Sequence, residues 1–224
     1  MEKEDLGTSV CPKDFKTAAV RHGRHFARYL YASKYAEGKR ILDAACGSGF
    51  GSAYMAEVAD SVLGLDLDDR LIKLAREQYS LPNLRFEVHD LNKPVTDAGF
   101  FDLITSFETL EHVSRASRCL SNLADVLTDD GTVLISVPNG TKELREGKNK
   151  PYHRMHFSVA DFTDLLDSQF SHVELYSQVY WRNFTHYLRK FIGKGTHHAS
   201  NYRFTSGLQD EAKTWLALCK KPRR

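Results

Sequence analysis

A glycine-rich loop and three aspartates are the residues whose types and spacing point most directly to ligand binding. The loop, Cys46-Gly-Ser-Gly-Phe-Gly51, follows a short apolar run and precedes a stretch with helical periodicity. Small residues at such a place let the backbone approach a ligand closely where a helix begins. Asp43 precedes the loop, Asp66 ends the next apolar run and Asp90 ends the one after. We therefore expect a crevice in which carboxylates face a polar ligand.

A second group of ionisable side chains follows the apolar run 101–106. Glu111 and His112 lie three and four residues after Glu108, so they can share one face of a turn or short helix with it. Two carboxylates beside an imidazole form an oxygen and nitrogen ligand set, and each of these groups can also act as a base. The alternative is that the Glu-His pair packs over a ligand or caps a helix without any metal.

Alternating strands and helices are needed to bring these groups together. Apolar, β-rich runs occupy 40–45, 61–66, 84–88, 101–106 and 132–137, and helical patterns occupy 51–59, 68–79 and 115–127. This alternation predicts an α/β fold with a parallel sheet, in which the carboxyl ends of neighbouring strands share one crevice. After 138–140 we expect a polar loop to 150, a helix near 159–168 and strands at 172–176 and 213–219. The segment 182–207 reads as an irregular insertion.

Composition favours a single domain over residues 1–224. The chain is 42% hydrophobic and 27% charged, which is enough apolar material for one sizeable core. Its net charge of +2 does not favour nucleic acid or an anionic membrane as the main partner, although residues 41–130 carry a net −9 and 182–224 a net +8. The four cysteines form no zinc or disulfide pattern, and we find no signal peptide or membrane span, so a cytoplasmic location is expected.

Four motifs in order resemble those of the class I S-adenosylmethionine-dependent methyltransferases. They are Ile41-Leu-Asp-Ala-Ala-Cys-Gly-Ser-Gly49, Leu63-Gly-Leu-Asp66, His89-Asp-Leu91 and the run 127–138. The resemblance implies a Rossmann-like seven-stranded sheet with helices on both faces and an antiparallel last strand. It also implies S-adenosylmethionine as cofactor, with residues 1–38 forming an N-terminal helical lid.

The same resemblance implies which residues contact the cofactor. Gly47 and Gly49 would hold the methionine part, Asp66 the ribose, Leu67 the adenine face, Asp90 and Leu91 the adenine edge, and Phe107 would add a further contact. Asp43 suits a cationic amino group. Arg28 is expected to reach the cofactor carboxylate and Tyr29 to cover it, with a surface arginine and a core tyrosine as the alternative.

The Glu-x-x-Glu-His sequence resembles metal-dependent O-methyltransferases, which include enzymes of small-RNA 3′ ends and of ubiquinone-pathway catechols. This resemblance implies that Glu108, Glu111, His112 and His153 hold a divalent ion, with His156 as a rival to His153. Carboxylate ligands favour Mg²⁺ or Mn²⁺. We expect His112 and Glu108 to be catalytic, since an acceptor hydroxyl must lose its proton during transfer.

A further resemblance, to bacterial methyltransferases of polysaccharides and natural-product sugars, is carried by five segments. They are His25-x-x-Arg28-Tyr29, 106–112, Ser136-Val-Pro-Asn139, Pro151-Tyr-His153 and Val173-Glu-Leu-Tyr-Ser-Gln178. It implies metal-assisted O-methylation of a small polyhydroxylated acceptor, with 182–207 shaping the acceptor site. The alternatives are 2′-O-methylation of an RNA 3′ end, methylation of a catechol, an NAD-dependent oxidoreductase or a non-catalytic nucleoside-binding module.

Overall fold

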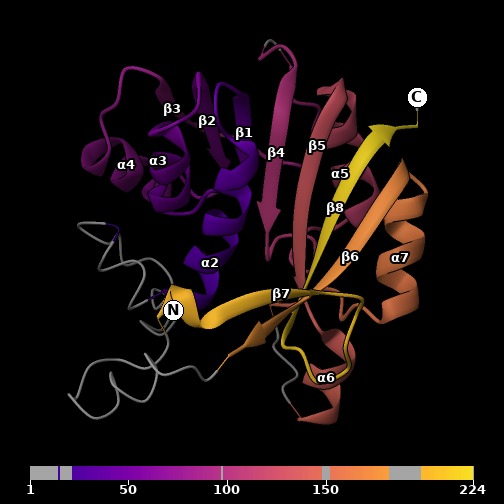
Figure 1. Ribbon diagram of the computed structural model, residues 1–224. Coiled ribbons are helices and arrows are strands. Elements are labelled where there is room, and N and C mark those ends of the chain that lie inside the picture. Colours follow the sequence, from indigo (N-terminus) through magenta and orange to yellow (C-terminus); the bar gives the residue numbers. More distant parts are fainter. Residues whose placement is uncertain (1–14, 16–21, 97, 148–151, 182–197, 224) are drawn as a thin grey trace, which may run out of the picture.

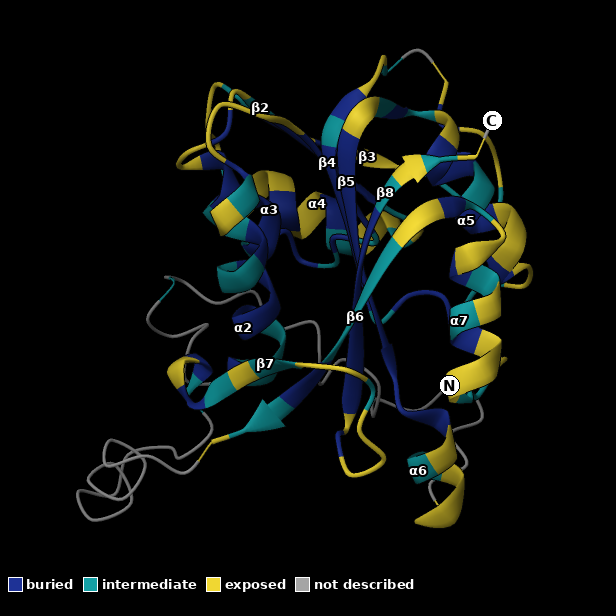
Figure 2. Cartoon of the chain, turned by 45° about the vertical axis from the view of Figure 1, so that its right-hand side comes forward, coloured by how far each residue is buried: buried dark blue, intermediate teal, exposed yellow. Residues whose placement is uncertain are grey.

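One mixed sheet with helices on both faces forms the protein (Figures 1 and 2). The computed structural model describes residues 15, 22–96, 98–147, 152–181 and 198–223. Within them the strand order is β3-β2-β1-β4-β5-β8-β6-β7. The strands are β1 (Arg40–Ala44), β2 (Ser61–Asp66), β3 (Leu84–Val88), β4 (Phe101–Phe107), β5 (Leu127–Pro138), β6 (Phe170–Tyr180), β7 (Tyr202–Ser206) and β8 (Thr214–Pro222). The predicted Rossmann-like α/β class is confirmed.

The first five strands of this order are parallel, which brings their carboxyl ends to one edge of the sheet. Strand β8 then inserts antiparallel between β5 and β6, with Val133 opposite Cys219 and Val173 opposite the same cysteine. The expected antiparallel last strand is therefore present. The strand order reverses at β1, because β2 and β3 lie on one side of β1 and β4 and β5 on the other. Ligands of open parallel sheets bind at such a reversal.

Helices cover both faces of the sheet (Figure 2). One face carries α2 (Gly23–Ala32), α3 (Phe50–Ala56) and α4 (Asp69–Gln78), and the other carries α5 (Ala116–Asp125) and α7 (Val159–Asp167). Caps define where two of them begin: the Asp68 side chain accepts from the Arg70 amide, and Ser158 and Asp161 form a capping box. No helix in the described ranges has the length and apolar character that a membrane crossing requires.

Consecutive residues of the central strands enter two separate cores, one on each face of the sheet. Ile41, Leu103 and Leu134 pack with the α2, α3 and α4 side. Their immediate neighbours Leu42, Ile104 and Ile135 pack with the α5 and α7 side. This explains why these strands read as continuous apolar runs rather than as an alternation of apolar and polar residues.

Two expectations about the second half of the chain were wrong. The sheet has an eighth strand, because β6 continues to Tyr180 and its extension pairs with β7, inside the segment that we expected to be irregular. Tyr31 and Phe204, whose ring centroids lie 4.6 Å apart, pack α2 against this added strand. The expected loop after residue 140 begins with the short helix α6 (Gly140–Arg145), which starts where the Asn139 side chain accepts from the Lys142 amide. Residues 182–197 of the expected insertion, and 1–14 and 16–21 of the expected lid, lie outside the described residues.

Candidate functional site

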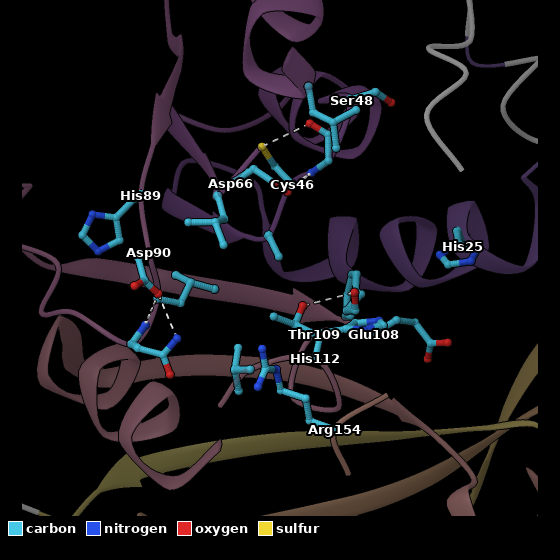
Figure 3. A pocket seen from close by; sticks show the side chains of 18 of the residues that line it. His25, Cys46, Ser48, Asp66, His89, Asp90, Glu108, Thr109, His112 and Arg154 are labelled. Carbon is cyan, nitrogen blue, oxygen red and sulfur yellow. Dashed lines mark hydrogen bonds between the residues drawn. The ribbon is translucent and has the colours of Figure 1, made fainter. Parts of the chain in front are cut away.

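A cavity of about 510 Å³ opens at the carboxyl ends of β1, β2 and β4 (Figure 3). Its size is within the usual range of small-molecule sites. Predicted site residues that line it are Gly47, Asp66, Leu67, Asp90, Leu91, Phe107, Glu108 and His112. Further lining residues include His25, Tyr29, Cys46, Ser48, His89, Asn92, Thr109, Ser114 and Arg154. Most of the predicted site residues therefore lie at the carboxyl edge of the sheet, where the sequence placed them.

The glycine-rich loop takes a backbone course that requires glycine. Gly47 and Gly49 have φ angles of +57° and +80°, in the left-handed region. A Cβ atom on Gly49 would lie 2.7 Å from the Phe86 ring and 2.8 Å from the Ala75 side chain. Gly49 does not line the cavity, so its part is to turn the chain into α3 while Gly47 borders the cavity.

Asp66 ties the end of β2 to this loop. One carboxylate oxygen accepts from the Gly47 amide at 2.8 Å and the other accepts from the Asp68 amide at 2.9 Å. Burial raises the pKa of Asp66. Each oxygen keeps capacity to accept a second hydrogen bond, so the side chain can receive two hydroxyl donors from a ligand.

Asp90 and Leu91 form the neighbouring part of the wall. The Asp90 carboxylate accepts from the backbone and side-chain nitrogens of Asn92 at 3.0 and 2.8 Å, which lowers its pKa. Leu91 is buried, whereas Leu67, on the β2 side of the cavity, is 69% exposed. Two aliphatic side chains near two carboxylates suit a flat ligand group that has polar edges.

Asp43 lies behind the cavity and does not line it. Its carboxylate is fully buried and accepts from the hydroxyls of Ser52 at 2.6 Å, Thr105 at 2.8 Å and Tyr29 at 3.2 Å. Burial raises the pKa of Asp43 to about 6, although the three hydrogen bonds oppose this. The Asp43 carboxylate, which the sequence suggested for a ligand amino group, therefore reaches the cavity wall through Tyr29, which donates to it and lines the cavity.

The Asp43→Asn variant should have an unfolding free energy that depends less on pH than that of the wild type. The folded-state pKa of about 6 exceeds the usual 3.8, so the unfolded chain releases this proton at lower pH. The wild type therefore loses up to about 3 kcal/mol of stability from this group as pH rises from about 4 to about 7, and regains it as pH falls. Urea unfolding at several pH values measures the difference, with exposed Asp60→Asn as control. Equal pH dependence in wild type and Asp43→Asn would contradict it.

Arg28 is fully buried and likewise does not line the cavity. Its guanidinium donates to the Gln178 side chain at 3.0 Å and to His25 Nδ1 at 2.7 Å, and lies 3.6 Å from the Glu108 carboxylate. Burial lowers its pKa, and the Glu108 charge opposes that change. In this structure Arg28 holds His25 and Glu108, two residues that do border the cavity.

Glu108 follows β4 in a conformation that costs backbone strain. Its φ angle is +54°, and Ala45 at the end of β1 has a φ of +67°. Residues other than glycine rarely adopt such angles, and those that do cluster at functional sites. The Glu108 amide donates to the Ser136 carbonyl at 2.9 Å, and the carboxylate extends away from Asp66 and Asp90, toward the His25 side (Figure 3).

Three of the four predicted metal ligands lie together beside the cavity. Glu111, His112 and His153 each offer a ligand atom, and these atoms lie within 4.8 Å of one another. The carboxylate of Glu108 is not part of this cluster; its closest charged partner is Arg28. Glu143 and His156 form a second, overlapping cluster with His153.

Second contacts orient both imidazoles of the first cluster. His112 Nδ1 lies 3.1 Å from the Tyr152 carbonyl, and His153 Nδ1 lies 3.0 Å from the Glu143 carboxylate. Because a carbonyl and a carboxylate accept, Nδ1 is the donor in both contacts, and in the neutral form of each ring the lone pair then lies on Nε2. His156 also faces Glu143, at 3.4 Å, so Glu143 is a member of the site that the sequence did not indicate.

Of the two acids in these clusters, Glu111 is the more buried. Its side chain is 1% exposed, and neither carboxylate oxygen has a hydrogen-bond partner among the described residues. Burial raises its pKa well above the usual value, and the charges of Glu108 and Glu143 raise it further. Its carbonyl accepts from the Arg154 amide at 2.7 Å, which fixes the segment that carries His153 against the Glu111 turn.

Comparisons with known proteins agree on one family. A family model described as a methyltransferase domain matches residues 18–186. A protein of Mycolicibacterium smegmatis, described as a "probable S-adenosylmethionine-dependent methyltransferase", is 30% identical over 154 residues, which are 67% of this chain and 59% of that protein. A ubiquinone biosynthesis O-methyltransferase of Coxiella burnetii is 33% identical over 115 residues, 50% of this chain and 49% of the relative. The chain thus spans about half to three fifths of the length of these relatives.

Solved structures share the fold. A methyltransferase from Thermotoga maritima, described as a "possible histamine N-methyltransferase", aligns with a TM-score of 0.65 and 14% identity, over 88% of this chain and 91% of that one. At such low identity the likeness shows the arrangement of strands and helices and says nothing of the acceptor.

Proposed function

This chain belongs to the class I S-adenosylmethionine-dependent methyltransferases, and we propose that it methylates an oxygen of a small, polyhydroxylated, sugar-like acceptor with the help of a divalent cation. The observation that carries this proposal is the cluster of Glu111, His112 and His153, of which His112 also borders the main cavity. The family match disfavours a nicotinamide-dependent oxidoreductase.

The lining of the cavity supports a cofactor placement. Asp66 would accept from the ribose hydroxyls, Asp90 and Leu91 would contact the adenine edge, and Leu67 its face. Gly47 would border the methionine part, next to Phe107. All of these residues line one cavity, which is what a single extended ligand requires. S-adenosylmethionine supplies an electrophilic methyl group when bound, so the chain has mainly to align the acceptor and take up its proton.

Glu108 and His112 are the groups that we propose for the proton. Both residues line the cavity. The Glu108 carboxylate lies on the side of the cavity opposite Asp90 (Figure 3). His112 Nε2 can accept a proton or ligate a cation, but one lone pair cannot do both at once. When His112 acts as a ligand, the Glu108 carboxylate, which lies outside the cluster, remains to accept the acceptor proton.

The residues present fit a divalent cation. A carboxylate buried without a hydrogen bond costs free energy, and a cation between Glu111, His112 and His153 would offset that cost. The Tyr152 carbonyl and Glu143 orient the two rings as second-layer groups do around metal-binding histidines. A cation there would lower the pKa of the acceptor hydroxyls and orient them.

The donor set favours Mn²⁺ over Mg²⁺. Mg²⁺ prefers oxygen ligands, whereas imidazole nitrogen suits transition ions. Because Glu108 lies outside the cluster, one carboxylate and two imidazoles remain. Of the two ions that the sequence suggested, manganese is therefore the one we propose.

Mn²⁺ titration followed by electron paramagnetic resonance tests the metal directly. Protein saturated with S-adenosylhomocysteine should show one tight site. A Glu111→Gln, His112→Ala double variant should lose it, whereas His172→Ala, which removes an exposed imidazole on β6, should keep it. A wild type without a tight site, or one whose site survives in the double variant, would contradict metal assistance and leave Glu108 and His112 as bases.

A catechol is a second candidate acceptor, favoured by the Coxiella burnetii relative, which is a ubiquinone biosynthesis O-methyltransferase. Catechols and sugars both offer vicinal oxygens, so the same cation site would serve either. An RNA 3′ end is the third, and its methylation should fall steeply as salt rises, whereas a neutral small acceptor should show almost no salt dependence. Comparing the three acceptor classes at low and high salt separates them.

A further inference from the structure

A second cavity, of about 210 Å³, meets the main one at Glu108, which lines both. Its wall is formed by α2, by the residue after β4, by the end of β5 together with α6, and by the residue before β8. The charged side chains on it are Arg24, Glu108, Lys142, Glu143, Glu146 and Lys213. A molecule that occupied both cavities would pass the Glu108 carboxylate.

The acids of this wall already face positively charged or imidazole groups. Glu108 lies 3.6 Å from buried Arg28, and Glu143 lies 3.0 Å from His153 and 3.4 Å from His156. Lys142 is also matched, because its ammonium lies 2.9 Å from the Glu211 carboxylate and 3.8 Å from that of Glu146.

Arg24 and Lys213 differ from these paired side chains. Within the ranges that the structure describes, neither side chain forms a hydrogen bond or an ion pair, although Arg24 is half-buried. Arg24 also stands close to another cation. Burial is the main reason that the pKa of Arg28 is lowered, and the Arg24 charge lowers it further. The wall of the second cavity therefore carries two positive side chains without a partner among the described residues, and an anion beside Arg24 would offset its repulsion with Arg28.

On the basis of the proposed methyltransferase function, we propose that the second cavity binds a carboxylate or phosphate group of the methyl acceptor, between Arg24 and Lys213. A guanidinium presents paired donors that match the oxygens of both anions, and a lysine adds a compact charge. An acceptor held there by its anionic group extends past Glu108 into the main cavity, where a hydroxyl would meet the proton-accepting group. The acceptor class is then a sugar acid or a sugar phosphate rather than a neutral sugar.

Binding of three related sugars tests this assignment without any need to know the natural acceptor. Glucuronate, glucose 6-phosphate and neutral glucose are titrated into the wild type saturated with S-adenosylhomocysteine, with inorganic phosphate as a fourth probe. We expect at least one of the charged sugars to bind about tenfold or more tightly than glucose. The difference between the two charged sugars tells a carboxylate site from a phosphate site.

An Arg24→Gln, Lys213→Gln double variant should bind the charged sugar about tenfold or more weakly than the wild type, because charge-assisted hydrogen bonds are lost. Lys73→Gln, at an exposed lysine of α4, serves as the matched control and should leave binding unchanged. Affinity for S-adenosylhomocysteine should be the same in both variants and the wild type, which shows that the variants are folded.

Two results would overturn the inference. In the first, the wild type binds the charged sugars and phosphate no more tightly than glucose. In the second, the double variant still binds a charged sugar more tightly than glucose by the same factor as the wild type. Failure of the wild type to bind S-adenosylhomocysteine is a separate outcome, and it would contradict the proposed function rather than the anion site.

Discussion

The Asp66→Ala variant should bind S-adenosylhomocysteine about 100-fold more weakly than the wild type. A charged acceptor contributes about 1.5 to 3 kcal/mol per hydrogen bond, and the loss of two ribose hydroxyl bonds corresponds to about 3 kcal/mol. The substitution also removes the acceptor of the Gly47 and Asp68 amides, so the loop that borders the cavity loses its tie to β2. Both effects act in the same direction.

Isothermal titration of the wild type and two variants checks this expectation. Asp66→Asn keeps the shape and one acceptor oxygen, and it should bind with intermediate affinity. Asp60→Ala removes an exposed aspartate just before β2, at the opposite edge of the sheet, and should leave the affinity unchanged. An Asp66→Ala variant that binds within about threefold of the wild type would show that the ribose does not lie on this carboxylate.

The Glu111→Leu variant should be more stable than the metal-free wild type by about 1 to 3 kcal/mol. Function, rather than stability, would account for an acid at this position. Both carboxylate oxygens are buried and lack a hydrogen bond within the described residues, and the charges of Glu108 and Glu143 oppose ionisation. An aliphatic side chain of similar volume removes that cost.

Urea unfolding in the presence of a chelator measures this difference. Glu77→Leu, at an exposed position of α4, is the matched control and should change stability by less than about 0.5 kcal/mol. Added Mn²⁺ should stabilise the wild type and not Glu111→Leu, because only the native site binds it. A Glu111→Leu variant that is less stable than the wild type under chelation would mean that the carboxylate makes a favourable contact in solution.

Much of the cavity could be predicted because it depends on local sequence. Asp66 ends one apolar run typical of a strand and Asp90 lies two residues after the next, and parallel strands bring their carboxyl ends together whatever the rest of the chain does. The glycine loop is equally local, since glycine adopts the φ angle of Gly49 without strain and leaves room for the Phe86 ring. The site could therefore be assigned to the carboxyl edge of the sheet without knowing how the helices pack.

What escaped prediction depends on contacts between distant segments. Arg28 was expected to reach the cofactor carboxylate, yet it donates to Gln178, which lies 150 positions away in the sequence. Glu143 lies in a polar stretch that reads as a loop, and only the folding of α6 brings it to His153. Strand β7 was missed because Tyr202–Ser206 is short and gains its regularity from pairing with β6.

A crystal structure of the protein with S-adenosylhomocysteine and Mn²⁺, with anomalous data at the manganese edge, is the most direct measurement. We predict the nucleoside over Asp66 and Asp90, and a single manganese peak between Glu111, His112 and His153. An S-adenosylhomocysteine molecule bound outside this cavity, or a fully occupied cavity with no manganese at that cluster, would contradict metal-assisted methyl transfer at the carboxyl edge of the sheet.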